Sequence, residues 1–133
     1  MNKNNSLEVI KDCTTYIKNH LQDTLTAEFL ASRYGYSLYH FCHIFKICCD
    51  MSPGKYIRLL RLEKAKKDIL SGMSITQAGF DNGFETSSGF SKAFRKEYGI
   101  SAREYLKQNK ESEVLIMLHV EIKALRSQTA LGY

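Results

Sequence analysis

Apolar residues recur every three or four positions along most of this chain, which is the spacing that places them on one face of an α-helix. In residues 7–21 the recurring positions are Leu7, Ile10, Thr14, Ile17 and Leu21. A second helix is predicted over 26–34, and Gly35 then supplies a residue that tolerates a left-handed turn. Helical spacing resumes after Ser37, with an apolar face made by Phe41, Ile44, Phe45 and Cys48. The second and third helices are therefore predicted to form a helix-turn-helix.

The same arrangement occurs a second time. A short apolar segment over 75–80 is followed by Gly83 and by a helix over 85–98, after which Ser101 can cap a short final helix. Gly35 and Gly83 match at an offset of 48 residues, and the positions that follow match at 49. The matched pairs are Phe41 and Phe90, Phe45 and Phe94, Lys46 and Arg95, Met51 and Ile100, Ser52 and Ser101, and Tyr56 and Tyr105. Two copies are too few for a solenoid, so the repeat predicts one paired module.

One long helix is predicted between the two copies. Ser52 is a candidate N-cap, Pro53 suits the first helical position, and Gly72 follows the last apolar residue. From Pro53 to Leu70 this helix would measure roughly 27 Å at 1.5 Å per residue. Major-groove segments on one side of B-DNA recur about every 34 Å, so the connector suits two recognition helices on one duplex.

The character of the sequence changes after Leu106. A polar stretch, KQNKESE, precedes residues rich in β-branched and aliphatic side chains, and these alternate over 119–124 as in a strand. We therefore expect a tandem helix-turn-helix domain over 1–109, and a linker with a strand-like tail over 110–133. The predicted fold class is all-α, with about seven helices in two helix-turn-helix subdomains joined by a long connecting helix, and a short β-like C-terminal tail.

The charge of the chain is concentrated in the predicted module. The formal net charge is +5, and residues 38–96 alone carry ten Lys or Arg against five Asp or Glu. Between the apolar positions of the helix over 85–98, from Ser87 to Lys96, lie Ser, Lys and Arg side chains with no acidic residue among them. Such a face suits a polyanion, although an ordinary solvated surface has the same composition.

Other classes of function find little support in the sequence. Cys13, Cys42, Cys48 and Cys49 have no CxxC spacing and follow no signal peptide, so we expect free thiols in a reducing cytoplasm. No set of four His and Cys ligands is complete, so neither a metal nor a cofactor is expected. There is no apolar run of the roughly 20 residues that a membrane span needs. Without a nucleophile elbow or a phosphate-binding loop, we expect no enzyme and no catalytic residues.

Residues 7–108 resemble the DNA-binding domain of the AraC/XylS family of bacterial transcription regulators. The resemblance rests on SLYHFCHIFK for the first recognition helix, on SPGKYIRLLRLEKAKKDIL for the connector, and on ITQAGFDNGFETSSGFSKAFRKEYGISAREY for the signature region. The chain departs from the family at Ala102, where proline is usual, at Gly79, where alanine is usual, and at Gly89, where an aromatic residue is common.

Carried over by position, the resemblance implies two recognition helices, over 37–49 and 85–98. Base contacts would come from Tyr39, Cys42 and His43 in the first helix and from Ser87, Ser88, Ser91 and Lys92 in the second. Phosphate contacts would come from Lys46, Arg58, Arg95 and Lys96. The first helix lacks Arg or Gln at these positions, the side chains best shaped for bidentate reading of guanine or adenine.

The resemblance implies a cytoplasmic transcription activator that binds specific sequences of double-stranded DNA, with RNA polymerase as a protein partner. The tail HVEIKALRSQTALGY is similar to the first strands of a GyrI-like effector-binding domain. A small-molecule effector is expected only if a complete C-terminal domain follows. The alternative is a helical adaptor whose basic surface binds an acidic protein such as RNA polymerase.

Overall fold

The computed structural model describes residues 3–110 and 117–118, and all regular structure within these residues is α-helical. The helices are α1 (Lys3–Asn19), α2 (Ala27–Arg33), α3 (Leu38–Cys49), α4 (Pro53–Leu70), α5 (Ile75–Asp81) and α6 (Ser87–Tyr98), followed by helical residues at 102–110. The chain divides into two compact units, Met1–Phe90 and Ser91–Tyr133. The predicted all-α fold with about seven helices is confirmed for the described part of the chain.

Side-chain hydroxyls fix where most of these helices begin. Thr26, Ser37, Ser52 and Ser74 each accept a hydrogen bond from the backbone N–H three residues later, at 3.0 to 3.2 Å. Ser101 accepts in the same way from the N–H of Glu104. Each bond satisfies one of the N–H groups that a helix leaves unpaired at its start. The caps predicted at Thr26, Ser37, Ser52 and Ser101 are confirmed, and Pro53 begins α4 as expected.

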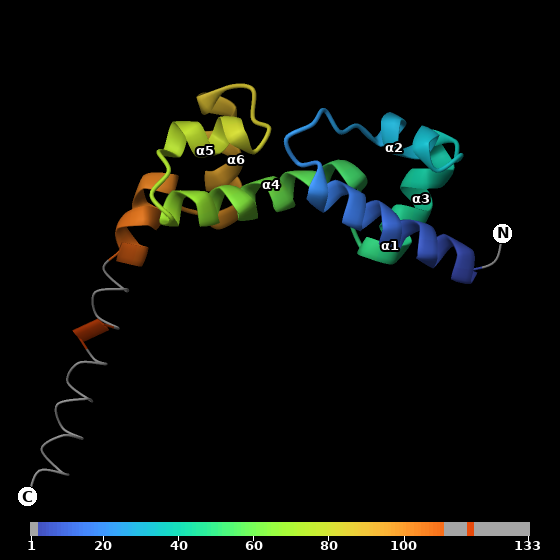
Figure 1. The fold of residues 1–133 in the computed structure, drawn as a ribbon, viewed down its shortest axis with the longest axis horizontal. Helices are drawn as coiled ribbons and strands as arrows, with labels where there is room; N and C mark the ends of the chain where they lie inside the picture. Colours follow the sequence, from blue (N-terminus) through green and yellow to red (C-terminus); the bar gives the residue numbers. More distant parts are fainter. Residues whose placement is uncertain (1–2, 111–116, 119–133) are drawn as a thin grey trace, which may run out of the picture. The chain divides into compact units, whose positions relative to one another are not determined.

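The first helix-turn-helix is built on a core that α1, α2, α3 and the start of α4 share. Figure 1 shows α1, α2 and α3 gathered at one end of the long α4, with α5 along its other end. The core residues are Ile10, Cys13, Ile17, Leu21, Leu25, Leu30, Ala31, Tyr36, Phe41, Ile44, Phe45 and Ile57. Leu7 is half exposed, so its predicted place on the buried stripe of α1 is wrong, and Cys13 completes that stripe instead.

Burial gives Cys13 a measurable effect at alkaline pH. Loss of solvent, with the nearby Cys49 and Asp12 adding to it, raises the pKa of the Cys13 thiol from 9.0 to about 12. The unfolded chain therefore loses this proton at a lower pH than the folded chain. The contribution of the Cys13 thiol to the free energy of unfolding is fully present below pH 9 and is lost as the pH rises toward 12. We expect Cys13 to lower the free energy of unfolding by up to about 1.4 kcal/mol per pH unit above pH 9.

Urea unfolding at pH 8, 9 and 10 measures this effect, and Cys13→Ala is the control. The variant should lose some stability at every pH, because it leaves a small cavity, but its pH dependence should be shallower than that of the unchanged chain. If the free energy of unfolding falls equally steeply with pH in the two proteins, the effect does not come from Cys13.

The first unit also contains the start of the second helix-turn-helix. Leu62, Ala65 and Ile69 of α4 are buried where α4 packs against α5. Gly79 of α5 lies so close to Phe90 that a Cβ atom would be 2.9 Å from two ring carbons, which explains glycine where the family usually has alanine. The ring of Phe84 packs on Phe90 as well, with centroids 5.1 Å apart.

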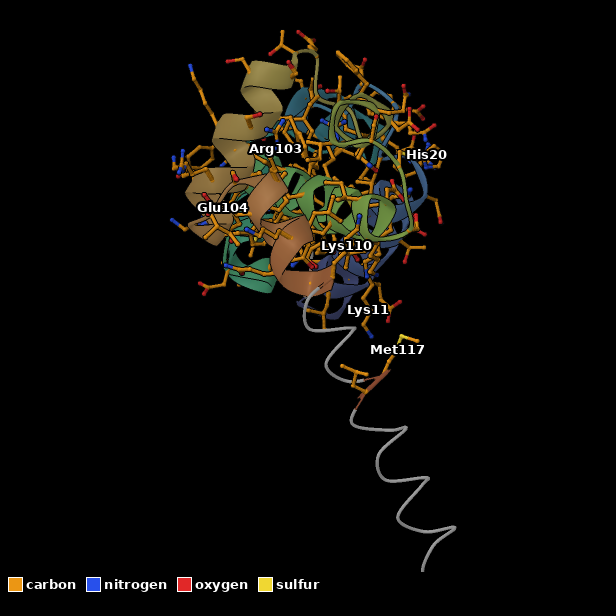
Figure 2. All side chains as sticks on the ribbon, turned by 90° about the vertical axis from the view of Figure 1, so that its left-hand side faces the viewer. Lys11, His20, Arg103, Glu104, Lys110 and Met117 are labelled. Atoms are coloured by element: carbon orange, nitrogen blue, oxygen red, sulfur yellow. The ribbon has the colours of Figure 1, made fainter. Side chains whose placement is uncertain are left out.

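The second unit has a small aromatic core of its own. Phe94 is fully buried and makes edge contacts with Tyr98 at 4.7 Å and with Tyr105 at 5.7 Å between ring centroids. Ala102 is buried at the start of the last helix. Arg103 and Glu104 of that helix, both labelled in Figure 2, are exposed.

The C-terminal tail can be compared with its prediction at two positions only. Met117 and Leu118 are helical, so the strand-like conformation expected of the tail is wrong at these residues. Both are good helix formers, and the alternation that suggested a strand lies further along, at 119–124. The remainder of the predicted strand-like segment, and the predicted start of a GyrI-like domain there, lie outside the described residues.

Candidate nucleic-acid interface

The residues that flank α3 fix where this helix begins and where it ends. Gly35 has φ of 75°, the left-handed conformation expected of it, and Ser37 then caps the first turn. At the other end Asp50 adopts φ of 59° and donates its N–H to the carbonyl of Lys46. Asp tolerates this conformation better than most residues, so α3 stops here without a glycine.

Three predicted contact residues share the exposed side of α3. Tyr39, His43 and Lys46 are exposed, whereas Phe41, Ile44 and Phe45 are buried on the opposite side. The rings of Tyr39 and His43 are stacked, with centroids 6.3 Å apart and planes within 3° of each other. Tyr39 is 83% exposed. Residues four apart on a helix are neighbours, so the structure brings these two together as one flat polar and aromatic surface.

Cys42 occupies a different position from the other predicted residues of α3. Its side chain is only partly exposed, and it packs against the core of the first helix-turn-helix. Cys42 therefore lies at the edge of the exposed surface and not at its centre.

Ile47, which the sequence had not suggested as a contact residue, is 69% exposed and lies one turn beyond His43. An isoleucine exposed to this extent on a candidate recognition helix offers an apolar contact to a ligand. The sequence could have indicated this position, because Ile47 lies four residues after His43 and eight after Tyr39, and these intervals place all three residues on one side of a helix.

The second candidate helix, α6, begins differently. Thr86 accepts the N–H of Gly89 at 2.9 Å and so caps a helix whose cap the sequence had not identified. All six predicted contact residues of α6 are exposed: Ser87, Ser88, Ser91, Lys92, Arg95 and Lys96. Phe90 and Phe94 are buried. The predicted division of α6 into an apolar side and a side of hydroxyls and cations is thus present in the structure.

Two arginines of α4 have different surroundings. Arg58, a predicted phosphate contact, is exposed and lines an open groove of about 180 Å³ together with Leu25 and Phe84. Arg61 lies one turn further on and is partly buried, and burial lowers the pKa of its guanidinium. It remains charged, since arginine does not lose its proton in proteins. Its hydrogen bonds make it a second functional candidate that the sequence had not suggested.

The described residues contain no arrangement typical of a metal site or of a membrane span. Among the described residues, no group of three or more His, Cys, Asp and Glu side chains is placed to hold a metal ion. The four cysteines are free thiols. Within the described helices, none is both long enough and apolar enough to cross a membrane.

Two capped helices, each preceded by a short helix and a glycine turn, define a tandem helix-turn-helix protein. The family model described as a helix-turn-helix domain matches residues 30–108, and the chain belongs to this family, that of the AraC-type DNA-binding domains. The resemblance drawn from the sequence is thereby confirmed for the helical part of the chain.

Individual relatives agree with this assignment. The chain is 31% identical over 100 residues to the transcriptional activator RhaS of Escherichia fergusonii, an alignment that covers 74% of this chain and 36% of RhaS. It spans 32% of the right origin-binding protein of Escherichia coli K12, so it corresponds to about a third of each of these relatives.

Solved structures share the fold. The C-terminal domain of AraT, a response regulator from Geobacillus stearothermophilus, has a TM-score of 0.72 at 26% identity, with 75% of this chain and 84% of that domain covered. The DNA-binding domain of AdpA, solved in complex with a target DNA, has a TM-score of 0.74 at 19% identity, with 77% and 94% covered. The likeness to AdpA concerns the fold alone.

Proposed function

We propose that this chain is a transcription regulator that binds specific sequences of duplex DNA by inserting α3 and α6 into adjacent major-groove segments. The observation that carries the proposal is the exposed side of α6, where Lys92, Arg95 and Lys96 stand beside three serine hydroxyls. Cations and hydroxyls are the groups that bind phosphate oxygens and base edges. The complex of AdpA with its target DNA supports DNA as the ligand of this fold.

The two helices would contribute differently to binding. Phosphate contacts by Arg95 and Lys96 supply affinity that does not depend on sequence and that falls as salt rises, whereas Lys92 contacts a base. On α3 only Lys46 is cationic at the exposed side, so that helix reads bases through the stacked Tyr39 and His43 and through Ile47. Apolar and aromatic side chains of this kind contact the methyl group of thymine in the major groove.

Alanine variants of α6 test the proposal. We expect Lys92→Ala to weaken binding to a selected duplex by about 1–3 kcal/mol, because it removes a base contact. Arg95→Ala should lower the slope of log affinity against log salt by about one unit, because one phosphate contact is lost. Binding is measured by mobility shift over a salt series, after sites have been selected from a random duplex library.

Lys11→Ala is a matched control, since Lys11 is an exposed lysine on α1, outside both candidate helices. Figure 2 labels this side chain. The control should leave both the affinity and the salt slope close to those of the unchanged chain. If Lys92→Ala and Arg95→Ala behave like this control, α6 is not a reading helix.

The adaptor alternative differs in its ligand. A helical adaptor for an acidic protein would form no tight complex with any duplex in the selection, at low or at moderate salt. Recovery of a common sequence from the random library would exclude it.

We further propose RNA polymerase as the protein partner, an assignment supported by the name of RhaS, a transcriptional activator. A cytoplasmic location follows from this function, because the DNA of a bacterium lies there. A small-molecule effector belongs to the proposal only if a complete C-terminal domain follows, and catalysis is no part of it.

A further inference from the structure

Arg61 joins three separate segments of the first unit. Its Nε donates a hydrogen bond to the carbonyl of Leu21 at 3.0 Å, and its Nη2 donates to the carbonyl of Asp23 at 2.8 Å. Both carbonyls belong to the loop between α1 and α2. A single side chain of the connecting helix therefore holds the loop from which the first helix-turn-helix starts.

The third segment is the turn between α5 and α6. A Cβ atom on Gly83 would lie 2.7 Å from Nε and 2.8 Å from Cζ of Arg61, and 3.1 Å from the carbonyl oxygen of Leu21. The bare backbone of Gly83 thus lies directly against the guanidinium and the loop. An open groove of about 420 Å³ has Asp23 and Leu25 of the loop, Gly83 and Glu85 of the turn, and Arg61 in its lining.

The surroundings of Arg61 make these contacts costly to give up. The side chain is partly buried, and a buried charge is tolerated only when hydrogen bonds replace the water that it has lost. Charge-assisted hydrogen bonds to carbonyls are also roughly twice as strong as neutral ones. The two hydrogen bonds use Nε and Nη2, which point the guanidinium at the loop, so the geometry supports a role in holding the loop.

We propose that Arg61 is a positioning residue that fixes the distance and rotation between the two DNA sequences that α3 and α6 read. The inference rests on the proposed function. The packing of α4 against α3 and α5 sets the general arrangement, and Arg61 adds a direct link between the loop and the turn, through two hydrogen bonds to the loop and close contact with Gly83. Each base pair inserted between two half-sites moves the second one by about 3.4 Å and rotates it by about 36°. The unchanged chain, which has Arg61, should therefore bind a duplex of altered half-site spacing with lower affinity.

The test measures how strongly binding depends on this spacing. The selected duplex is compared with versions that have one base pair inserted or removed between the sequences read by the two helices. For the unchanged chain we expect a loss of about tenfold in affinity per step, comparable to a mismatched base pair. In Arg61→Met, which keeps the length of the side chain but has no donors, the loss should shrink to about threefold or less.

Arg58→Met is the matched control, because Arg58 is an exposed arginine of the same helix that also lines the 180 Å³ groove. As a phosphate contact it should lower affinity and salt slope on every duplex, yet keep the full tenfold spacing penalty. Arg61→Lys, which keeps one charged donor group, should show an intermediate penalty. It also provides a second variant in case Arg61→Met does not give a folded protein by circular dichroism.

Two failures can be told apart. If the unchanged chain selects no sequence at all, the proposed function is wrong and the role of Arg61 in reading DNA is wrong with it. If the unchanged chain binds selectively but the Arg61 variants keep its full spacing penalty, DNA binding stands and only the positioning role is overturned.

Discussion

Gly83→Ala is expected to lower the free energy of unfolding by about 3 kcal/mol, far more than the same change at Gly35. Gly83 has φ of 91°, and a side chain in such a conformation costs of order 1–2 kcal/mol. The new methyl group would also displace the guanidinium of Arg61, whose charge-assisted hydrogen bonds to Leu21 and Asp23 would then weaken. The loss of such a bond adds about 1.5–3 kcal/mol.

Gly35→Ala is the matched control because the two glycines occupy equivalent positions of the internal repeat. Gly35 has φ of 75°, but no atom lies within 4 Å of the position of a Cβ atom. Only the backbone strain remains, so the expected loss is about 1 kcal/mol. Urea unfolding followed by circular dichroism at 25 °C measures both variants.

The difference between the two glycines should depend on Arg61. In an Arg61→Met background Gly83→Ala should cost less than in the unchanged chain, because the charged group is no longer there to displace and only the backbone strain and the contact with the carbonyl of Leu21 remain. Equal losses for Gly35→Ala and Gly83→Ala in the unchanged chain would show that the guanidinium moves aside freely. That outcome would also weaken the positioning role proposed for it.

The features that the sequence predicted correctly are those that local rules determine. Helix starts follow from hydroxyl caps at residues such as Ser37 and Ser52, and α4 ends at Leu70 as its apolar spacing indicates. Both repeat glycines have the positive φ that a turn between two helices requires. Each of these signals lies within a few residues of the structure that it produces.

The features that sequence analysis missed depend on contacts between distant residues. The side chain of Arg61 pairs with carbonyls 38 and 40 residues earlier, and no periodicity indicates which backbone oxygen a surface arginine reaches. Ile47 has the same apolar character as its buried neighbour Ile44, and only its angular position on α3 leaves it exposed. The sequence thus predicted the two helices of the candidate interface. It did not predict the hydrogen bonds of Arg61 that support them or the exposure of Ile47.

Asn82→Asp is expected to lower the free energy of unfolding by about 3–5 kcal/mol, as is typical when a buried charge is left without a partner. Asn82 is fully buried at the end of α5, and its Nδ2 donates to Asp68 Oδ2 and to the carbonyl of Ala78, both at 2.8 Å. An aspartate would place a carboxylate oxygen against these two acceptors. The second carboxylate oxygen would find no hydrogen-bond donor, because Oδ1 of Asn82, whose place it takes, has no hydrogen-bond partner among the described residues.

Gln77→Glu offers a matched comparison within the same helix. Gln77 donates its side-chain amide to the carboxylate of Asp81 at 2.6 Å, but this pair is exposed to water. Replacing the amide by a carboxylate there should cost less than about 1 kcal/mol, because solvent screens exposed charges. Urea unfolding of the two variants should therefore separate an effect of burial from an effect of charge alone.

The pH dependence of Asn82→Asp tests the same mechanism. Burial raises the pKa of an introduced carboxyl group above its value in the unfolded chain, so the stability of the variant is lost as pH rises and recovered as pH falls. The protonated carboxyl group can also donate one hydrogen bond to Asp68 or Ala78, as the amide does. We expect the destabilisation to be smaller at pH 5 than at pH 8, whereas a loss that is equal at both values would point to altered packing and not to buried charge.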